Sequence, residues 1–216
     1  MYFIHQEVQV VDSILYSGMR NQIKSIKKVI EHQEMNYSVI TNAEIMMIRL
    51  FLQNKLESKN KVFFINVDNC NYHQIKDIIE SNYENNENKY RYYVYIQFIN
   101  GVSLGHWILT VYIVNGREER INEIRIYNSL PETTPRNYQL HLAYPKTPLY
   151  VVEGLPRQKG LDCGYWSLFY AFIVFLTPES LDMISELKES LNEKFEMFKS
   201  FVKNCLKVAH DKVMKL

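Results

Sequence analysis

The sequence predicts an α+β fold in which a central mixed β-sheet is flanked by helices. Three observations support this prediction. The middle of the chain holds successive segments rich in Tyr, Val, Ile and Phe, separated by turn residues, which is typical of strands. The segments on both sides carry apolar residues at intervals of three and four, which is typical of helices. Of the 216 residues, 47% are hydrophobic and 23% are charged, a composition that allows a core of ordinary size.

The first part of the chain is predicted to form helices around one strand. Apolar residues recur at helical spacing over residues 1–35, which predicts an N-terminal helical extension. Another helix is expected after Thr41 or Asn42, either of which can cap it. The other elements expected here are a buried strand at Val62–Val67, a helix at Tyr72–Asn82 and a surface loop from Asn82 to Lys89.

The middle of the chain is predicted to form most of the sheet. Asn115-Gly116 is a strong turn signal between two β-rich segments and predicts a hairpin. Several prolines then interrupt the pattern before one more short strand. The predicted strands are Tyr92–Ile99, Trp107–Val114, Ile121–Tyr127 and Leu149–Val152.

The end of the chain is predicted to be helical. An apolar helix is expected from Cys163 to about Leu176, and Pro178 opens a second helical region. The apolar residues of that region are expected to pack inside the protein: Leu187, Leu191, Phe195 and Phe198.

These elements predict a single domain with an N-terminal extension, which is an ordinary organisation for a chain of 216 residues. The extension covers residues 1–35 and the domain covers 36–216. Within the domain, we expect the catalytic core at about 92–176 and the C-terminal helices at 178–216.

The charge balance and the length of the apolar runs exclude two classes of function. With 25 basic and 24 acidic residues the formal net charge is +1, so we expect no general attraction to nucleic acid or to anionic membranes. The longest apolar run, from Trp166 to Leu176, is far shorter than the roughly 20 residues of a membrane span. The sequence therefore predicts a protein that neither binds nucleic acid nor spans a membrane.

The cysteines and the N-terminus indicate a compartment. Cys70, Cys163 and Cys205 are too few and too scattered for a disulfide framework, and we expect reduced thiols. The first residues lack the basic start and the apolar core of a signal peptide. Both observations indicate a soluble intracellular protein, and we expect it to be a monomer.

Cys163 lies directly before an apolar helix, between Asp162 and Gly164. A thiol at a helix N-terminus experiences the positive end of the helix dipole, so we expect the pKa of Cys163 to be lowered. Asp162 is suited to cap the helix, and Gly164 leaves room for a substrate carbonyl. Taken alone, a cysteine in this position also fits a buried structural role.

His106 and Asn128 provide possible partners for this thiol. His106 directly precedes one predicted strand, at the start of a β-rich run, and Asn128 follows the end of the next. If the two strands form a hairpin, the Asn side-chain oxygen can accept from the imidazole and fix its tautomer. A histidine, an asparagine and a helix-start cysteine together form a base, an orienting residue and a nucleophile.

The order and spacing of these residues resemble the clan CE cysteine proteases. This group includes the SUMO and NEDD8 proteases, the adenovirus-type proteases and bacterial effector deubiquitinases. The matching motifs, within about Val94 to Leu176, are His106-Trp107, Tyr127-Asn128-Ser129-Leu130 and Gln158 followed by Asp162-Cys163-Gly164.

The resemblance implies a role for each matched residue. His106 would be the general base, Cys163 the nucleophile and Asn128 the residue that orients the imidazole. Gln158 would donate to the oxyanion beside the backbone N–H of Cys163. Trp107 would lie over the Gly-Gly tail of the modifier, and we assign Asp162 and Gly164 with it to substrate binding. No metal or cofactor is expected.

Two positions depart from the family pattern. Most of the family has Asp where this chain has Asn128, so the imidazole gains an orienting group but no negative charge. Gln158 lies one position nearer to Cys163 than the family's Gln, and Arg157 occupies the usual position.

The resemblance implies an isopeptidase that cleaves ubiquitin, or a ubiquitin-like modifier such as SUMO or NEDD8, from lysine conjugates through a thioester on Cys163. The flanking regions and short core are more similar to bacterial effector deubiquitinases than to SUMO proteases. Ubiquitin is therefore the favoured modifier, and delivery into a host cytosol is the implied route. Two alternatives stay open, namely an acetyltransferase of the YopJ type and a catalytically silent module that binds ubiquitin.

Overall fold

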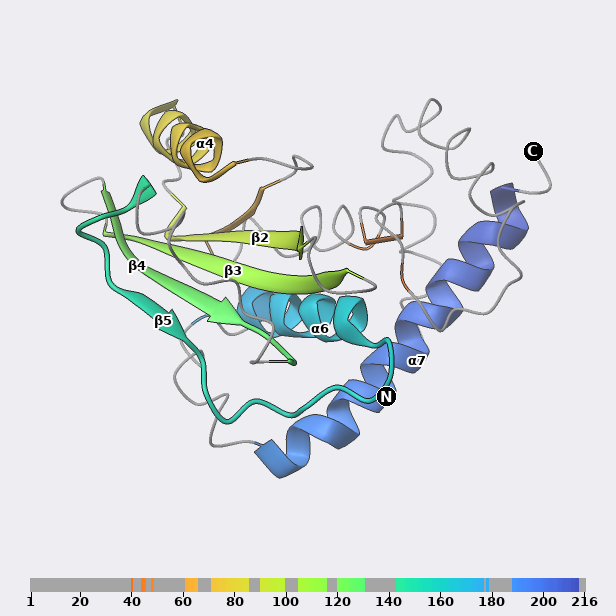
Figure 1. Cartoon of the computed structure of the whole chain (residues 1–216). Coiled ribbons are helices and arrows are strands. Elements are labelled where there is room, and N and C mark those ends of the chain that lie inside the picture. The colour runs from red at the N-terminus through yellow and green to blue at the C-terminus, as the bar shows by residue number, and fades with distance from the viewer. Residues whose placement is uncertain are drawn as a thin grey trace.

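A computed structural model of the chain shows a mixed sheet with helices on both of its faces (Figure 1). The sheet has five strands in the order β1-β2-β3-β4-β5. The residues that the structure describes are 40, 44–45, 48, 61–65, 71–85, 90–99, 105–115, 120–130, 143–176, 178 and 188–213.

The strands pair in both directions. β2 (Tyr92–Ile99), β3 (His106–Asn115) and β4 (Arg120–Tyr127) form an antiparallel meander. The short strands β1 (Val62–Phe64) and β5 (Leu149–Val151) add to its two edges in parallel, next to β2 and β4 respectively. The prediction of an α+β fold with a central mixed sheet is therefore confirmed.

Successive residues of the central strands enter two separate cores. In β2, Val94 packs in the core on one face, while its neighbours Tyr93 and Tyr95 pack in the core on the other. This alternation follows from the strand geometry, in which successive side chains point to opposite faces. Because both faces are covered, the strands are apolar along nearly their whole length rather than at every second residue.

Helix α4 (Tyr72–Asn85) covers one face of the sheet (Figure 1). Asn71 caps it, since the Asn71 side chain accepts from Gln74 N–H at 3.0 Å and the Gln74 side chain accepts from Asn71 N–H at 2.9 Å. Its apolar face packs on the sheet, because Ile75 and Ile79 are buried against the strands. The loop predicted from Asn82 is wrong at its start, because the helix continues through Asn85.

Helices α6 (Cys163–Leu176) and α7 (Lys188–Val213) cover the other face. α6 lies between the sheet and α7 and is apolar on nearly all sides, which explains its continuous hydrophobic sequence. The two helices join where the rings of Trp166 and Phe195 stack with centroids 3.7 Å apart.

Most predictions for the helical end of the chain are confirmed. The α6 bounds agree with the prediction, and Leu191, Phe195 and Phe198 are buried as expected. Leu187 and the extension at residues 1–35 lie outside the described residues. Of the helix predicted after Thr41, the structure describes three residues, all helical and buried: Glu44, Ile45 and Ile48.

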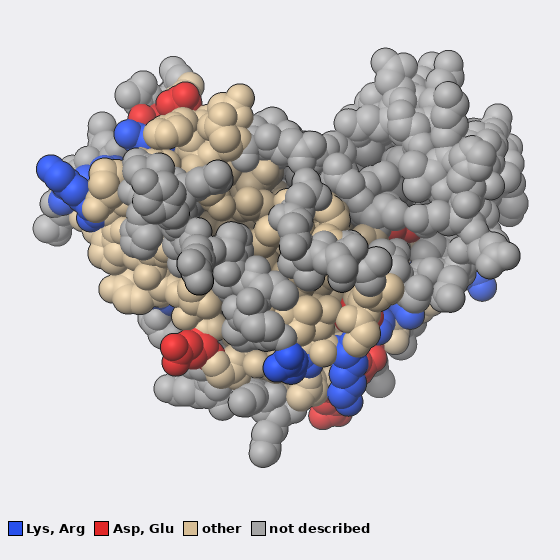
Figure 2. Space-filling model, in the orientation of Figure 1, with Lys and Arg blue, Asp and Glu red and all other residues tan. Residues whose placement is uncertain are grey.

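Charges of both signs are spread over the described surface. Figure 2 shows basic and acidic side chains close together in the lower part of the view, in keeping with the near-zero net charge. In the described part of the chain, no helix combines the length and the apolar character needed to cross a membrane.

Candidate active site

The β3–β4 hairpin brings His106 and Asn128 together. His106 is the first residue of β3, and Asn128 directly follows Tyr127, the last residue of β4. The antiparallel pairing places these two strand ends side by side, and His106 Nε2 lies 2.6 Å from Asn128 Oδ1. Both residues are buried, with exposed fractions of 2% and 1%. The pairing expected from the sequence is therefore present.

The hydrogen bonds of Asn128 define the tautomer of the imidazole. Leu130 N–H donates to Asn128 Oδ1 at 2.8 Å, which requires an oxygen at that position and so fixes the orientation of the carboxamide. The same oxygen faces His106 Nε2, so Nε2 must be the donor. In a neutral imidazole Nδ1 is then the nitrogen that carries the lone pair and can accept a proton.

The helix α6 brings Cys163 to the same strand end. Cys163 is the first residue of α6 and is partly buried. The backbone N–H of Trp107, the residue after His106, hydrogen-bonds the Cys163 sulfur. The thiol thus lies beside the beginning of β3, where the imidazole is also located.

Burial of Cys163 raises the pKa of its thiol above the ordinary value. The backbone N–H groups of Trp107, Gly164 and Cys163 lower this pKa, while the negative charge of Asp162 raises it further. The expectation of a lowered pKa is therefore wrong, because desolvation of the thiolate outweighs the stabilisation from the helix N-terminus.

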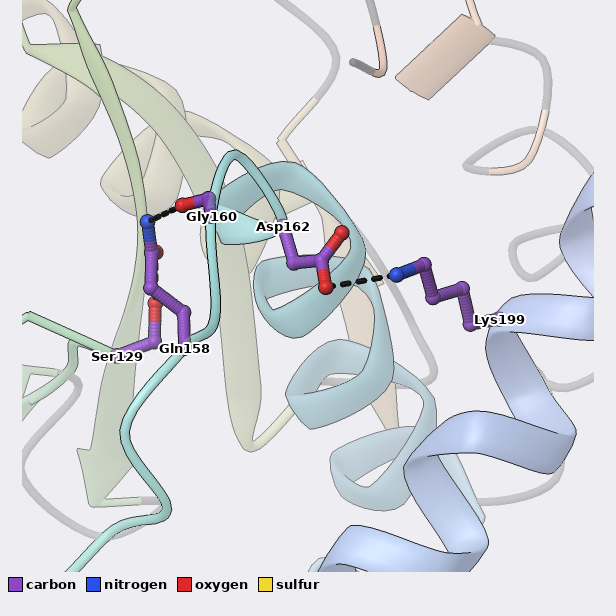
Figure 3. A network of polar contacts seen from close by, with 5 residues as sticks. All are labelled: Ser129, Gln158, Gly160, Asp162 and Lys199. Atoms are coloured by element: carbon purple, nitrogen blue, oxygen red, sulfur yellow. Dashed lines mark hydrogen bonds and ion pairs between the residues drawn. The ribbon is translucent and has the colours of Figure 1, made fainter. Parts of the chain in front are cut away.

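Gln158 is tied to the strand end that carries Asn128 (Figure 3). Ser129 Oγ donates to Gln158 Oε1 at 2.7 Å, and Gln158 N–H donates to the Ser129 carbonyl at 3.2 Å. On its other side, Gln158 Nε2 donates to the Gly160 carbonyl at 2.9 Å. These three bonds give the carboxamide a defined orientation within the segment that leads to Cys163.

Asp162 points away from this segment toward α7. Its carboxylate accepts from Lys199 Nζ at 2.7 Å (Figure 3), while its backbone carbonyl accepts from Trp166 N–H at 3.0 Å in the first turn of α6. The predicted substrate-binding residue thus has its carboxylate in an ion pair with a helix of the protein itself.

Gly164 and Trp107 meet at the base of the site. A side chain at Gly164 would collide with Ile40 and would come within 3.3 Å of Trp107 Cδ1. The room left by the glycine, expected to receive a substrate carbonyl, is filled by Ile40. Trp107 is buried, and its ring packs against Phe98 of β2 with centroids 4.8 Å apart. Phe98 itself is 39% exposed.

Sequence reasoning missed three residues that shape this site: Ser129, Lys199 and Phe98. Ser129 follows Asn128 directly, so its position in the motif was a usable signal. Phe98 pairs with Trp107 in the register of β2 and β3, which becomes visible only once the strands are aligned. Lys199 gives no local signal, because its partner is 37 residues away.

The described residues bring a thiol, an imidazole, an orienting carboxamide and a second carboxamide close together. This is the set of groups that nucleophilic acyl transfer by a cysteine uses. In the described ranges, no group of three or more His, Cys, Asp or Glu side chains is placed to hold a metal ion.

Comparison with known proteins relates the fold to a protease. No protein-family model and no curated protein matches the sequence. A solved structure described as a de-sumoylating protease is similar to this chain, with a TM-score of 0.57 and 12% sequence identity. The similarity covers 84% of this chain and 90% of that one. At this identity the match shows a shared fold, in agreement with the clan CE-like architecture expected from the motifs.

Proposed function

We propose that this protein is a cysteine isopeptidase that cleaves ubiquitin or a ubiquitin-like modifier from lysine conjugates after the modifier's Gly-Gly tail. The observation that carries the proposal is the buried hydrogen bond between His106 and Asn128, next to a cysteine that begins a helix. The shared fold with a de-sumoylating protease supports the same reading, because that protein has a related chemistry on the same architecture.

The tautomer of His106, with its proton on Nε2, supports a role as general base. In the proposed reaction, Nδ1 takes the proton of the Cys163 thiol as the sulfur attacks the carbonyl carbon of the terminal glycine. The imidazolium then gives this proton to the lysine amine, and the carbon–nitrogen bond breaks. Water hydrolyses the resulting thioester with His106 again as the base, which returns the free thiol and a carboxylate.

The raised pKa of Cys163 indicates when the proton moves. Because burial disfavours the thiolate, the thiol of the resting site keeps its proton. Proton transfer then accompanies attack instead of preceding it. Asn128 suits this sequence, since it orients the ring without the negative charge that would stabilise a permanent imidazolium.

The oxyanion is proposed to be stabilised by the backbone N–H of Cys163 and by Gln158. Gln158 Nε2 carries two hydrogens, and its bond to the Gly160 carbonyl uses one of them. The second is available to a substrate oxygen. The bond from Ser129 supports this assignment, because it holds the carboxamide with its nitrogen directed away from Ser129.

The aromatic pair of Trp107 and Phe98 is proposed to face the Gly-Gly tail. Trp107 directly follows the general base, and Phe98 is partly exposed beside it. A narrow aromatic surface accommodates glycines better than residues with side chains. Ubiquitin is the first candidate modifier because of the similarity to bacterial effector deubiquitinases, and delivery into a host cytosol is part of that proposal. SUMO is the second, because the similar structure is that of a de-sumoylating protease.

The test uses ubiquitin, SUMO and NEDD8 probes that carry a thiol-reactive group at the C-terminus. We expect an adduct with at least one probe, seen as a band shift in gel electrophoresis, and its loss in Cys163→Ala. Cys205→Ala serves as the matched control, since it removes a buried thiol of α7 and should leave the adduct intact. A folded protein that reacts with none of the probes would overturn the proposal and favour acetyl transfer or a silent binding module.

A further inference from the structure

The segment that leads to the proposed nucleophile is held from outside the catalytic core. Asp162 immediately precedes Cys163, and its carboxylate pairs with Lys199 in the middle of α7 (Figure 3). The exposed fractions of the two side chains are 17% for Lys199 and 13% for Asp162. A pair so little exposed is screened less by solvent and salt than an ordinary surface pair.

The ammonium group of Lys199 is held in place by its surroundings. It lies over the ring of Tyr165 at 5.7 Å and over the ring of Phe195 at 5.9 Å. Phe195 in turn stacks on Trp166 of α6, so the same contact region joins the two helices and orients the lysine. Any shift of α7 along α6 would therefore also move the charge that faces Asp162.

The carboxylate of Asp162 acts directly on the neighbouring thiol. Its negative charge disfavours the thiolate and contributes to the raised pKa of Cys163. A cation bonded to that carboxylate compensates for its charge. Without it, Asp162 would be an uncompensated and nearly buried anion next to a sulfur that must itself become negative.

We propose that Lys199 is a positioning residue for Cys163, which anchors the turn before the nucleophile and neutralises the carboxylate beside it. This makes α7 a functional part of the active site, although it lies outside the sequence motifs of the catalytic core. The inference rests on the proposed role of Cys163 as the nucleophile.

Other titratable side chains on the neighbouring elements must be kept constant in a test. His106 approaches from β3, and Lys203 lies on α7 one turn beyond Lys199, over the ring of Tyr165 at 5.9 Å. Glu44 is buried four residues after Ile40, the residue that contacts Gly164. Each of these stays unchanged in the decisive variants.

The experiment measures the alkylation rate of Cys163 as a function of pH in the full chain, using iodoacetamide and mass spectrometry of the peptide that contains Cys163. Lys199→Met should raise the apparent pKa by about one unit, the lower end of what a nearby charge produces. At neutral pH this lowers the thiolate fraction about tenfold and slows alkylation roughly threefold to tenfold, because a more basic thiolate is also more nucleophilic. Lys199→Arg should restore the original profile.

Two further variants separate electrostatics from damage to the fold. Asp162→Asn should shift the profile in the opposite direction, because it removes the negative charge. The double variant Lys199→Met with Asp162→Asn should return close to the unaltered protein, whereas two independent structural defects would add. Lys203→Met is the matched control, since it removes the same charge from the Tyr165 ring rather than from Asp162.

The outcomes distinguish this inference from the proposed function. If Lys199→Met and Asp162→Asn both leave the alkylation profile unchanged, the inference is overturned even when the modifier probes still react. If none of the probes reacts but the two profiles shift in opposite directions, the isopeptidase proposal fails while the coupling between Lys199 and the thiol stands. Equal shifts in Lys199→Met and Lys203→Met would also overturn it, because the effect would then be one of general charge.

Discussion

Two parts of the candidate site are held in place in different ways. The strand-end pair, His106 and Asn128, lies at the open end of the β3–β4 hairpin, where His106 pairs with Ile99 of β2 and Asn128 follows the last paired residue of β4. The approach segment, Gln158–Asp162, has no such ladder. Its first residue, Gln158, is hydrogen-bonded to Ser129, which lies 29 residues earlier in the sequence. Its last residue, Asp162, is paired with Lys199, which lies 37 residues later.

The difference shows how the site divides its tasks. The strand-end pair inherits its geometry from the most regular and most buried part of the fold, where small movements are costly. The approach segment depends on two side-chain contacts and lies at the surface for part of its length, with Lys159, Gly160 and Leu161 exposed. We therefore expect changes in the strand-end pair to act on the chemistry, and changes in the approach segment to act on its alignment.

The largest expected effect tests the strand-end pair. His106→Ala removes the proposed general base, and the value of kcat/KM on a modifier substrate should fall by roughly 10²–10⁴. His73→Ala, which removes an exposed imidazole on α4, is the matched control and should keep full activity. Steady-state kinetics on the two variants decides this. Unchanged turnover in His106→Ala would show that the buried hydrogen bond has a structural role only.

A smaller effect is expected in the approach segment. Gln158→Ala removes the proposed oxyanion donor and should lower kcat by roughly 10²–10³. Ser129→Ala leaves the backbone bond from Gln158 N–H intact, so it should cost only about 0.5–1.5 kcal/mol, which is roughly twofold to thirteenfold in rate. Kinetics of both variants provides the comparison. A loss in Ser129→Ala as large as that in Gln158→Ala would mean that the carboxamide has no orientation without the serine.

The same division explains what the sequence could predict. The three central site residues lie at the ends of a strand or helix that the pattern of apolar residues indicates: His106, Asn128 and Cys163. The observed bounds of these elements agree with the predicted ones to within one residue. Such positions depend on local patterns of two and 3.6 residues. The hairpin was also predictable, because Asn115-Gly116 is a local turn signal.

The remaining features depend on contacts between distant segments. The link from Lys199 to Asp162 requires the packing of α7 on α6, and no local pattern indicates which of the lysines on α7 faces the site. The requirement for glycine at position 164 is likewise not visible in the local sequence, because the side chain that excludes a Cβ there belongs to Ile40, far away in the sequence. The direction of the Cys163 pKa shift was predicted wrongly because the helix dipole is visible in the sequence whereas desolvation is not.

The smallest expected effect compares two glycines, one from each part of the site. Gly105 precedes His106 and has φ of 71°, and Gly160 lies in the approach segment with φ of 64°. Both adopt a left-handed conformation, so a change to Ala should cost each about 1–2 kcal/mol in stability. Only Gly105 has a neighbour in the way, because a Cβ there would overlap the ring of Phe98, while Gly160 has open space.

Gly105→Ala should therefore destabilise the protein more than Gly160→Ala does. Phe98 must turn aside and lose its contact with Trp107, which adds about 0.5–1.5 kcal/mol, the value of an aromatic pair. Chemical denaturation of the two variants measures the difference in the free energy of unfolding. Equal losses would mean that the ring of Phe98 moves at no cost in stability. The aromatic pair of Trp107 and Phe98 beside the proposed Gly-Gly tail would then be adaptable. A larger loss at Gly105 would instead show that the contact between Phe98 and Trp107 resists displacement.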